Sequence, residues 1–149
     1  MPQSLVKILV HIVFSTKDRA KLITPEIEAQ LFGYISGVIT NNNGRMIIAG
    51  CTADHIHILV SIGRIDIGKL IGAIKRASSG WIKLQDDKFA KFYWQRGYGA
   101  FSIGQSQVDA VTKYIQNQKA HHAKQTFQDE YRELCNKYGV EIDERYCWD

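Results

Sequence analysis

Short runs of apolar, β-branched residues alternate along the chain with stretches of helical periodicity. Such runs are typical of strands, whereas apolar residues recurring every three or four positions indicate amphipathic helices. The predicted strands are residues 4–14, 45–51, 55–62 and 98–103. The predicted helices are residues 24–40, 67–84, 106–119 and 126–138. The order β-α-β-β-α-β, followed by two helices, predicts an α+β protein with a ferredoxin-like split β-α-β fold: a mostly antiparallel sheet with helices on one face, plus C-terminal helices.

Polar residues mark where several of these elements begin and end. Thr24 suits a helix N-cap, and Pro25 suits the first helical position because proline needs no hydrogen bond there. Three asparagines and a glycine at residues 41–44 end the first helix, and Gly139 ends the last. The turn at residues 52–54 is short enough to join two strands as an antiparallel hairpin.

Length and composition limit the class of protein. A chain of 149 residues is one domain of ordinary size, and its 45% hydrophobic and 23% charged residues exclude disordered and fibrous classes. We expect one domain over residues 1–149, with a core at about 5–125 and a C-terminal helix and acidic tail at about 126–149. Three widely spaced cysteines fit neither a disulfide framework nor a cysteine zinc site. Without an apolar segment of membrane length or a secretory pattern, we expect a cytoplasmic protein with no membrane partner.

The charge of +4 is distributed unevenly. Residues 1–100 hold 13 Lys and Arg against 7 Asp and Glu, whereas residues 101–149 hold 6 against 8. A basic body with an acidic tail is compatible with a nucleic-acid partner, although ordinary solvated surface is an equal alternative for any single residue. The candidate phosphate contacts are Lys17, Arg19, Lys21, Lys75, Arg76 and Arg96.

Two histidines in the third predicted strand are the first candidates for chemistry. Alternate residues of a strand share a face, so His55 and His57 point together while Ile56 and Ile58 point into the core. Two imidazoles on one face form half of a divalent-metal site. The alternative is a pair of polar residues on a solvated face. Asp54 is expected on the opposite face from His55, in a structural or turn-capping role.

A polar stripe on the third predicted helix is the second candidate. At about 100° per residue, Gln118 lies about 40° from Tyr114 and one turn along, and His121 lies about 20° from Tyr114 and two turns along. A phenol, an amide oxygen and an imidazole would then share one side of the helix. A tyrosine hydroxyl can attack phosphorus when a metal polarises the phosphate. The opposite side has apolar residues that can dock the helix: Val108, Val111 and Ile115.

For two other aromatic residues and one histidine, the sequence does not decide between a functional and a structural role. Trp94 and Tyr98 can stack on unpaired bases, although core packing is at least as plausible for Trp94. His11 lies within an apolar strand, which favours a buried core histidine whose hydrogen bonds are satisfied.

Together these motifs resemble the single-tyrosine transposases of the insertion-sequence-200-like group, which are HUH nucleases. His55-Ile56-His57 resembles their His-hydrophobic-His motif, and Tyr114-x-x-x-Gln118 resembles their nucleophile motif. Residues 9–17 and 92–102 are also similar to that family, whereas Ala53 stands where proline is usual. The resemblance extends over about residues 5–130.

The resemblance implies an enzyme that cleaves and rejoins single-stranded DNA bearing hairpins at the ends of a mobile element. His55, His57 and Gln118 would hold Mg²⁺ or Mn²⁺, and Tyr114 would form a 5′-phosphotyrosine. His121 would orient the metal or move a proton. The family also implies a homodimer whose sheets join and whose active sites can take the tyrosine helix from the other chain.

Two alternatives stay open at this point. One is a domesticated, repeat-associated tyrosine transposase that acts on genomic repeat hairpins with the same chemistry. The other is a ferredoxin-like nucleic-acid-binding module without catalysis, which the complete set of His55, His57, Tyr114 and Gln118 argues against.

Overall fold

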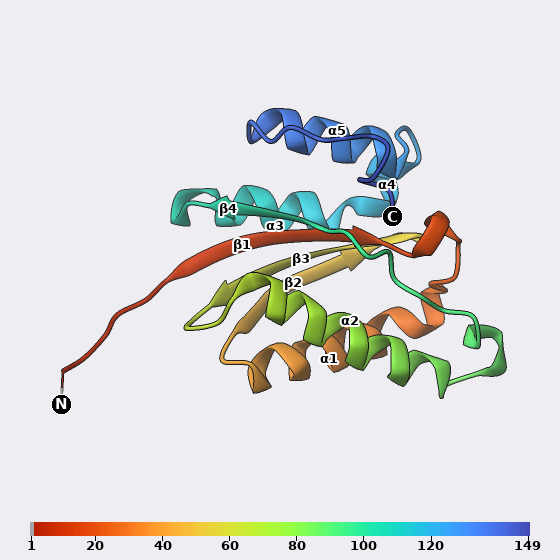
Figure 1. Ribbon diagram of the computed structural model, residues 1–149, viewed down its shortest axis with the longest axis horizontal. Coiled ribbons are helices and arrows are strands. Elements are labelled where there is room, and N and C mark those ends of the chain that lie inside the picture. Colours follow the sequence, from red (N-terminus) through yellow and green to blue (C-terminus); the bar gives the residue numbers. More distant parts are fainter. Residues whose placement is uncertain (1) are drawn as a thin grey trace.

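A computed structural model describes residues 2–149 and contains one four-stranded sheet (Figure 1). The strands are β1 (Ile8–Ser15), β2 (Arg45–Cys51), β3 (His55–Ile62) and β4 (Gly99–Ile103). They lie in the order β2-β3-β1-β4, and every neighbouring pair is antiparallel. This order and the α+β class confirm the predicted ferredoxin-like fold.

Helices cover both faces of the sheet (Figure 1). One face is covered by α1 (Pro25–Asn41) and α2 (Ile67–Lys83), as predicted for the split β-α-β unit. The C-terminal helices α3 (Val108–Gln116), α4 (Gln118–His122) and α5 (Phe127–Lys137) cover the opposite face. Three short 3-10 turns complete the set: η1 (Lys17–Arg19), η2 (Asp87–Phe89) and η3 (Gln105–Gln107). No helix within residues 2–149 is long and apolar enough to cross a membrane.

The main core lies between the sheet and α1 and α2. Ile56 and Ile58 of β3 are fully buried in it, together with Ile12 and Phe14 of β1. Residues of the opposite face of the same strands face α3, α4 and α5. The period of two in β3 therefore divides its side chains between an apolar core and a second, partly polar layer.

The first strand is shorter than the sequence pattern predicts. Ile8 pairs with Ile62, the last residue of β3, so residues 4–7 have no strand opposite them. These residues are exposed, with 83% of Leu5 accessible, and the N-terminal segment extends away from the sheet (Figure 1). The apolar run continues beyond the end of its partner, which is why pattern alone extended the strand.

The predicted helix at residues 106–119 is divided. The chain forms η3 and α3, leaves helical geometry at Asn117 (φ −96°, ψ 20°), and resumes as α4. Asparagine favours such a break because its side chain competes for local backbone hydrogen bonds. Angles counted along one continuous helix are therefore wrong for residues after Asn117.

Thr24 and Pro25 occupy the predicted first positions of α1, although the Thr24 side chain makes no capping hydrogen bond, and two helix C-termini follow the predicted turn chemistry. Asn43 adopts a left-handed conformation (φ 63°) after α1, and the Gly44 amide donates to the Ile39 carbonyl at 3.0 Å. Gly139 (φ 68°) does the same after α5, where the Val140 amide donates to the Cys135 carbonyl at 2.8 Å. Both are the closing hydrogen bonds of a left-handed helix C-terminus.

The C-terminal segment packs onto the sheet instead of forming a separate appendage. Phe127, Tyr131 and Leu134 of α5 are buried against Val13 of β1 and Phe101 of β4. The segment expected as a helix with an acidic tail thus forms a second apolar cluster on the face opposite the main core. It also brings Glu130 of α5 to the two predicted histidines of β3.

Candidate metal and nucleophile site

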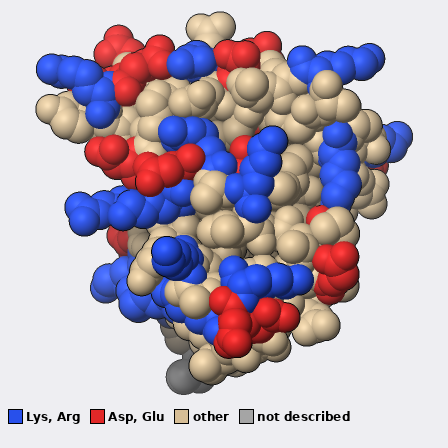
Figure 2. All heavy atoms as spheres, turned by 90° about the vertical axis from the view of Figure 1, so that its right-hand side faces the viewer, with Lys and Arg blue, Asp and Glu red and all other residues tan. Residues whose placement is uncertain are grey.

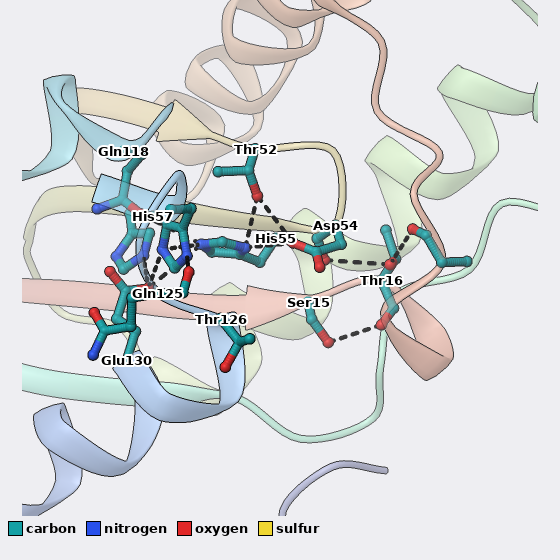
Figure 3. A network of polar contacts seen from close by, with 12 residues as sticks. Ser15, Thr16, Thr52, Asp54, His55, His57, Gln118, Gln125, Thr126 and Glu130 are labelled. Atoms are coloured by element: carbon teal, nitrogen blue, oxygen red, sulfur yellow. Dashed lines mark hydrogen bonds and ion pairs between the residues drawn. The ribbon is translucent and has the colours of Figure 1, made fainter. Parts of the chain in front are cut away.

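Three histidines and one glutamate meet beneath the C-terminal helices. His55 and His57 lie on β3, His122 is the last residue of α4, and Glu130 lies in the first turn of α5. One possible ligand atom from each residue lies within 4.8 Å of the others. His55 and His57 are fully buried, Glu130 is 1% exposed, and Figure 3 shows the three side chains converging. The alternation of β3 therefore does place both histidines on one face, but protein covers that face.

In each of the three histidines, Nδ1 points away from the cluster and has a hydrogen-bond partner. Asp54 Oδ1 lies 2.6 Å from His55 Nδ1, and the Gln125 carbonyl lies 2.7 Å from His122 Nδ1. Both partners accept hydrogen bonds, so they fix the proton on Nδ1 and leave the Nε2 lone pair facing the cluster. Such outer partners are the usual means by which proteins orient metal-binding histidines.

His57 obtains the same support from another histidine. Its Nδ1 lies 2.8 Å from Nε2 of His11, which is buried on the neighbouring strand β1. Either ring can donate to the other, so His57 can present either an N–H or a lone pair at Nε2. Burial lowers the pKa of His57 to about 4 and that of His11 to about 3, which keeps both rings uncharged at neutral pH. An uncharged His57 is the form that binds a metal.

Two imidazole nitrogens and one carboxylate oxygen lie close together at the middle of the cluster. His55 Nε2 and His122 Nε2 are 3.0 Å apart, and Glu130 Oε1 lies 3.4 Å from the first and 2.9 Å from the second. When both rings are neutral, these three atoms are all acceptors; a second proton on His55 or His122 makes its Nε2 a donor to Glu130, and a cation can take the place of such protons. The donor set of three imidazoles and a carboxylate therefore fits a divalent cation.

The ionisation of the carboxylates and of His55 follows from the same contacts. Burial alone raises the pKa of Glu130, but hydrogen bonds with His122, His55 and His57 outweigh it and hold the pKa below its ordinary value. Burial likewise lowers the pKa of His55, yet the hydrogen bonds with Asp54 and Glu130 leave it raised overall. The centre thus holds an ionised carboxylate that attracts positive charge.

Tyr114 reaches this centre from α3. Its hydroxyl donates to Glu130 Oε2, and its ring centroid lies 5.7 Å from that of His57. Burial, together with the charge of Glu130, raises the pKa of Tyr114 far above its usual range, so the phenol is protonated. The tyrosine hydroxyl and the histidine cluster therefore meet within one chain.

Close packing on β2 fixes the position of α3. Ile115, next to Tyr114, is fully buried with Leu9, Leu59 and Ile103, and Val108 and Val111 pack against the same cluster. A Cβ atom placed on Gly50 of β2 would lie 2.2 Å from the Ile115 carbonyl oxygen. Only glycine permits this close approach of helix and strand backbones.

Gln118 and His121 lie at the edge of the cluster. Gln118 is 1% exposed; its Oε1 lies 3.4 Å from His55 Nε2, and its Nε2 donates to the Tyr114 carbonyl at 3.2 Å. His121 Nε2 lies 3.4 Å from Glu130 Oε2, and its ring is 5.2 Å from that of Tyr114. Both expected residues are thus brought to the site, but His122 and Glu130 lie closer to its centre.

Two residues of the site have partners that the sequence did not predict, Asp54 and His11, and two were not assigned from the sequence, His122 and Glu130. Asp54 supports His55 from within the turn, where strand alternation does not apply. His11 is buried as expected, but its partner is His57. His122 ends α4, which follows the break at Asn117, and its Nε2 lies 3.0 Å from His55 Nε2. Glu130 lies three residues after Phe127, among the buried residues of α5. A carboxylate at such a position is uncommon, and this spacing was the feature of the sequence that could have identified Glu130 as a site residue.

The basic residues lie in different environments. Lys75 donates to the carbonyls of residues 95, 96 and 97 at 2.8, 3.1 and 2.7 Å, so its three N–H groups are used within the chain. The expectation that it contacts phosphate is therefore replaced by a structural role. Trp94 is also structural: it is buried, and its Nε1 donates to Ser78 Oγ at 2.9 Å.

The other candidate phosphate contacts remain accessible. Lys21 lines a cavity of about 700 Å³ beside His122, together with Lys119 and Lys124. Lys17 and Arg96 line a separate hollow of about 490 Å³. Arg76 is exposed on α2 and Arg19 is half-buried. Figure 2 shows basic side chains spread across one side of the molecule, with acidic groups among them.

Comparison with known proteins agrees with this arrangement. Residues 4–118 match the family model described as "Transposase IS200 like". The chain is 30% identical over 114 residues to the transposases for insertion sequence element IS200 of Salmonella typhimurium (strain LT2) and Salmonella typhi, covering 72% of this chain and 74% of each relative. The chain therefore belongs to the IS200-like transposase family.

Two solved structures share the fold. One is a protein of Deinococcus radiodurans R1 assigned as a transposase, with a TM-score of 0.59 and 20% identity over 79% of this chain and 98% of that one. The other is a REP-associated tyrosine transposase bound to a REP hairpin, with a TM-score of 0.61 and 14% identity over 82% of this chain and 73% of that one. At these identities, the likeness concerns the fold alone.

Proposed function

We propose that this transposase is a metal-dependent enzyme that cleaves and rejoins single-stranded DNA at hairpin-bearing ends through a 5′-phosphotyrosine on Tyr114. One observation carries the proposal: the hydroxyl of that tyrosine donates to Glu130, a carboxylate that belongs to a buried cluster with three imidazoles. Family membership makes DNA the substrate class. The non-catalytic alternative gives no reason to bury four ionisable groups against a phenol.

His55, His57, His122 and Glu130 would hold the cation, and Gln118 Oε1 remains a further candidate ligand at the edge. Three imidazoles suit Mn²⁺ better than Mg²⁺, which prefers oxygen ligands and retains its waters. When bound, the cation supplies polarisation of the scissile phosphate and stabilises the leaving 3′ oxygen. His11, Asp54 and the Gln125 carbonyl hold the imidazoles in the orientation that this requires.

The reaction of Tyr114 is a transesterification. The bond from its phenolic oxygen to phosphorus forms as the bond from phosphorus to the 3′ oxygen breaks, which leaves a 5′-phosphotyrosine. The proton lost by the phenol balances the proton gained by the 3′ hydroxyl. Rejoining reverses these bonds with the same or another 3′ hydroxyl, and no nucleotide cofactor is needed because the covalent link retains the energy of the original ester.

A hairpin substrate is supported by the structural neighbour that is bound to a REP hairpin. The cavity lined by Lys21, Lys119 and Lys124 adjoins His122 and offers positive charge to a strand that approaches the centre. The same neighbour also favours a second candidate function, a domesticated transposase that acts on genomic repeats. Hairpins flanking the gene on both sides would indicate a mobile element instead. A homodimer, implied by the family resemblance, remains part of the proposal, with each chain using its own tyrosine.

The test is incubation of the protein with hairpin-bearing single strands and Mn²⁺, followed by denaturing electrophoresis and mass spectrometry of the covalent adduct. Tyr114→Phe should bind DNA normally and form no adduct, because it keeps the ring and loses only the nucleophile. Tyr146→Phe is the matched control, since that tyrosine is 64% exposed and distant in sequence. An adduct on Tyr114→Phe, or undiminished cleavage in excess EDTA, would contradict the proposal.

A further inference from the structure

Glu130 has a different set of partners at each of its carboxylate oxygens. Oε1 lies 2.8 Å from His57 Nε2 and 2.9 Å from His122 Nε2. Oε2 accepts the hydrogen bond of the Tyr114 hydroxyl and lies 3.4 Å from His121 Nε2. A single side chain therefore joins the metal-binding histidines to the nucleophile.

The helix that carries Glu130 is held by its N-cap and by apolar packing. Thr126 caps α5 by accepting a hydrogen bond from the Asp129 amide at 3.2 Å. Phe127 and Tyr131, on either side of Glu130 along the helix, are buried against the sheet. Only 1% of the Glu130 surface is exposed, so the surrounding side chains restrict the position of its carboxylate. Holding a reacting group in this way removes much of the entropic cost of orienting it.

The ring of Tyr114 is half-buried, and Glu130 is the one side-chain partner of its hydroxyl among residues 2–149. Its ring lies 6.1 Å from that of His11, 5.7 Å from that of His57 and 5.2 Å from that of His121. These edge contacts limit where the ring lies, whereas the hydrogen bond to Glu130 sets where the hydroxyl points.

We propose that Glu130 is a positioning residue, which holds the Tyr114 hydroxyl beside the metal-binding histidines and makes α5 a part of the active centre. This inference rests on the proposed function. It also concerns a segment beyond the part of the chain that matches the family model, which ends at residue 118. The carboxylate thus lies on α5, outside the matched residues.

The experiment compares Glu130→Gln with Glu133→Gln, which removes the same charge from an exposed position on the same helix. The first readout needs neither metal nor DNA: the ultraviolet resonance Raman doublet of Tyr114, obtained by subtracting the spectrum of the matching Tyr114→Phe protein. It should report a strong hydrogen-bond donor in the wild type and in Glu133→Gln, and a weakened donor in Glu130→Gln.

The second readout is the single-turnover rate of adduct formation at saturating DNA and at saturating Mn²⁺, with metal affinity measured separately. A misplaced nucleophile should slow this rate by about 10²-fold in Glu130→Gln, with DNA affinity unchanged, and Glu130→Asp should recover part of it. Glu133→Gln should match the wild type.

Either of two results would overturn the inference. One is a Tyr114 signature that does not respond to Glu130→Gln. The other is an adduct rate in Glu130→Gln equal to or above that of the wild type, which would make Glu130 irrelevant or an obstacle to DNA. Failure of the wild type itself to form an adduct would instead refute the proposed function, and the spectroscopic comparison would still decide whether Glu130 holds the hydroxyl.

Discussion

Gly50→Ala should separate the placement of Tyr114 from its chemistry. The added Cβ would lie 2.2 Å from the Ile115 carbonyl oxygen and 3.0 Å from its Cγ2, whereas ordinary contacts begin at 3.4 Å. The closest atom belongs to the backbone of α3, so no side-chain rotation relieves the clash. Helix and strand must therefore separate by about 1 Å, and a displacement of that size costs about 10²-fold in rate when it reaches a reacting group.

The same clash should lower stability. Inserting a methyl group into a packed interface typically costs about 1–3 kcal/mol, which corresponds to a fall in Tm of several degrees for a chain of this length. The matched control is Gly37→Ala in α1, where an added Cβ meets nothing within 4 Å. That variant should be more stable by about 0.5–1 kcal/mol, because alanine is the better helix former, and it should keep the wild-type rate.

The assay for both variants is single-turnover adduct formation, well below the Tm of each protein, together with thermal unfolding followed by circular dichroism. A folded Gly50→Ala protein with the wild-type rate would refute the argument that contact with β2 positions Tyr114. Unchanged stability would refute the close backbone approach itself.

Three further predictions follow from the site. His11→Phe should preserve the fold but weaken Mn²⁺ binding by about 10–100-fold, because His57 loses its outer partner; a Mn²⁺ titration followed by electron paramagnetic resonance measures this, and unchanged affinity would exclude the supporting role. Lys75→Met should lower the free energy of unfolding by about 1–3 kcal/mol and leave the salt dependence of DNA binding unchanged, whereas loss of a true phosphate contact would reduce the log–log slope by about 0.7. If each chain uses its own tyrosine, as proposed, a mixture of Tyr114→Phe and His57→Ala should recover no cleavage; recovered cleavage would show that the tyrosine acts across a dimer.

Local patterns were sufficient for most of the fold. Alternation along residues 55–62 identified which side chains of β3 are apolar core, and the turn residues at 41–44 and Gly139 identified two helix ends. These features depend on neighbours in the sequence, which is the range over which periodicity and capping operate. The division of the helix at Asn117 was missed because a single asparagine is a weak signal within a helical pattern.

The site was less predictable because its members meet only through tertiary packing. His57 and Tyr114 were recognised from spacing and family resemblance, but the partnership of His11 with His57 depends on the register between β1 and β3. Glu130 required knowing that α5 folds back over the sheet. Its position in the buried stripe of α5 was visible in the sequence, but its charge suggested an acidic tail that would avoid DNA.

Along the eight residues of β3, the side chains of Ile56 and Ile58 lie in the apolar core, whereas those of His55 and His57 lie in the candidate site. Slipping the pairing of β3 by one residue would exchange the faces, moving His55 and His57 into the apolar core and Ile56 and Ile58 against Glu130. Such a misfolded form would lose the core and the chemistry together. Correct strand pairing in β3 therefore depends on the same alternation that brings His55 and His57 to the candidate site, and a chain with a correctly buried core already has these two side chains in place.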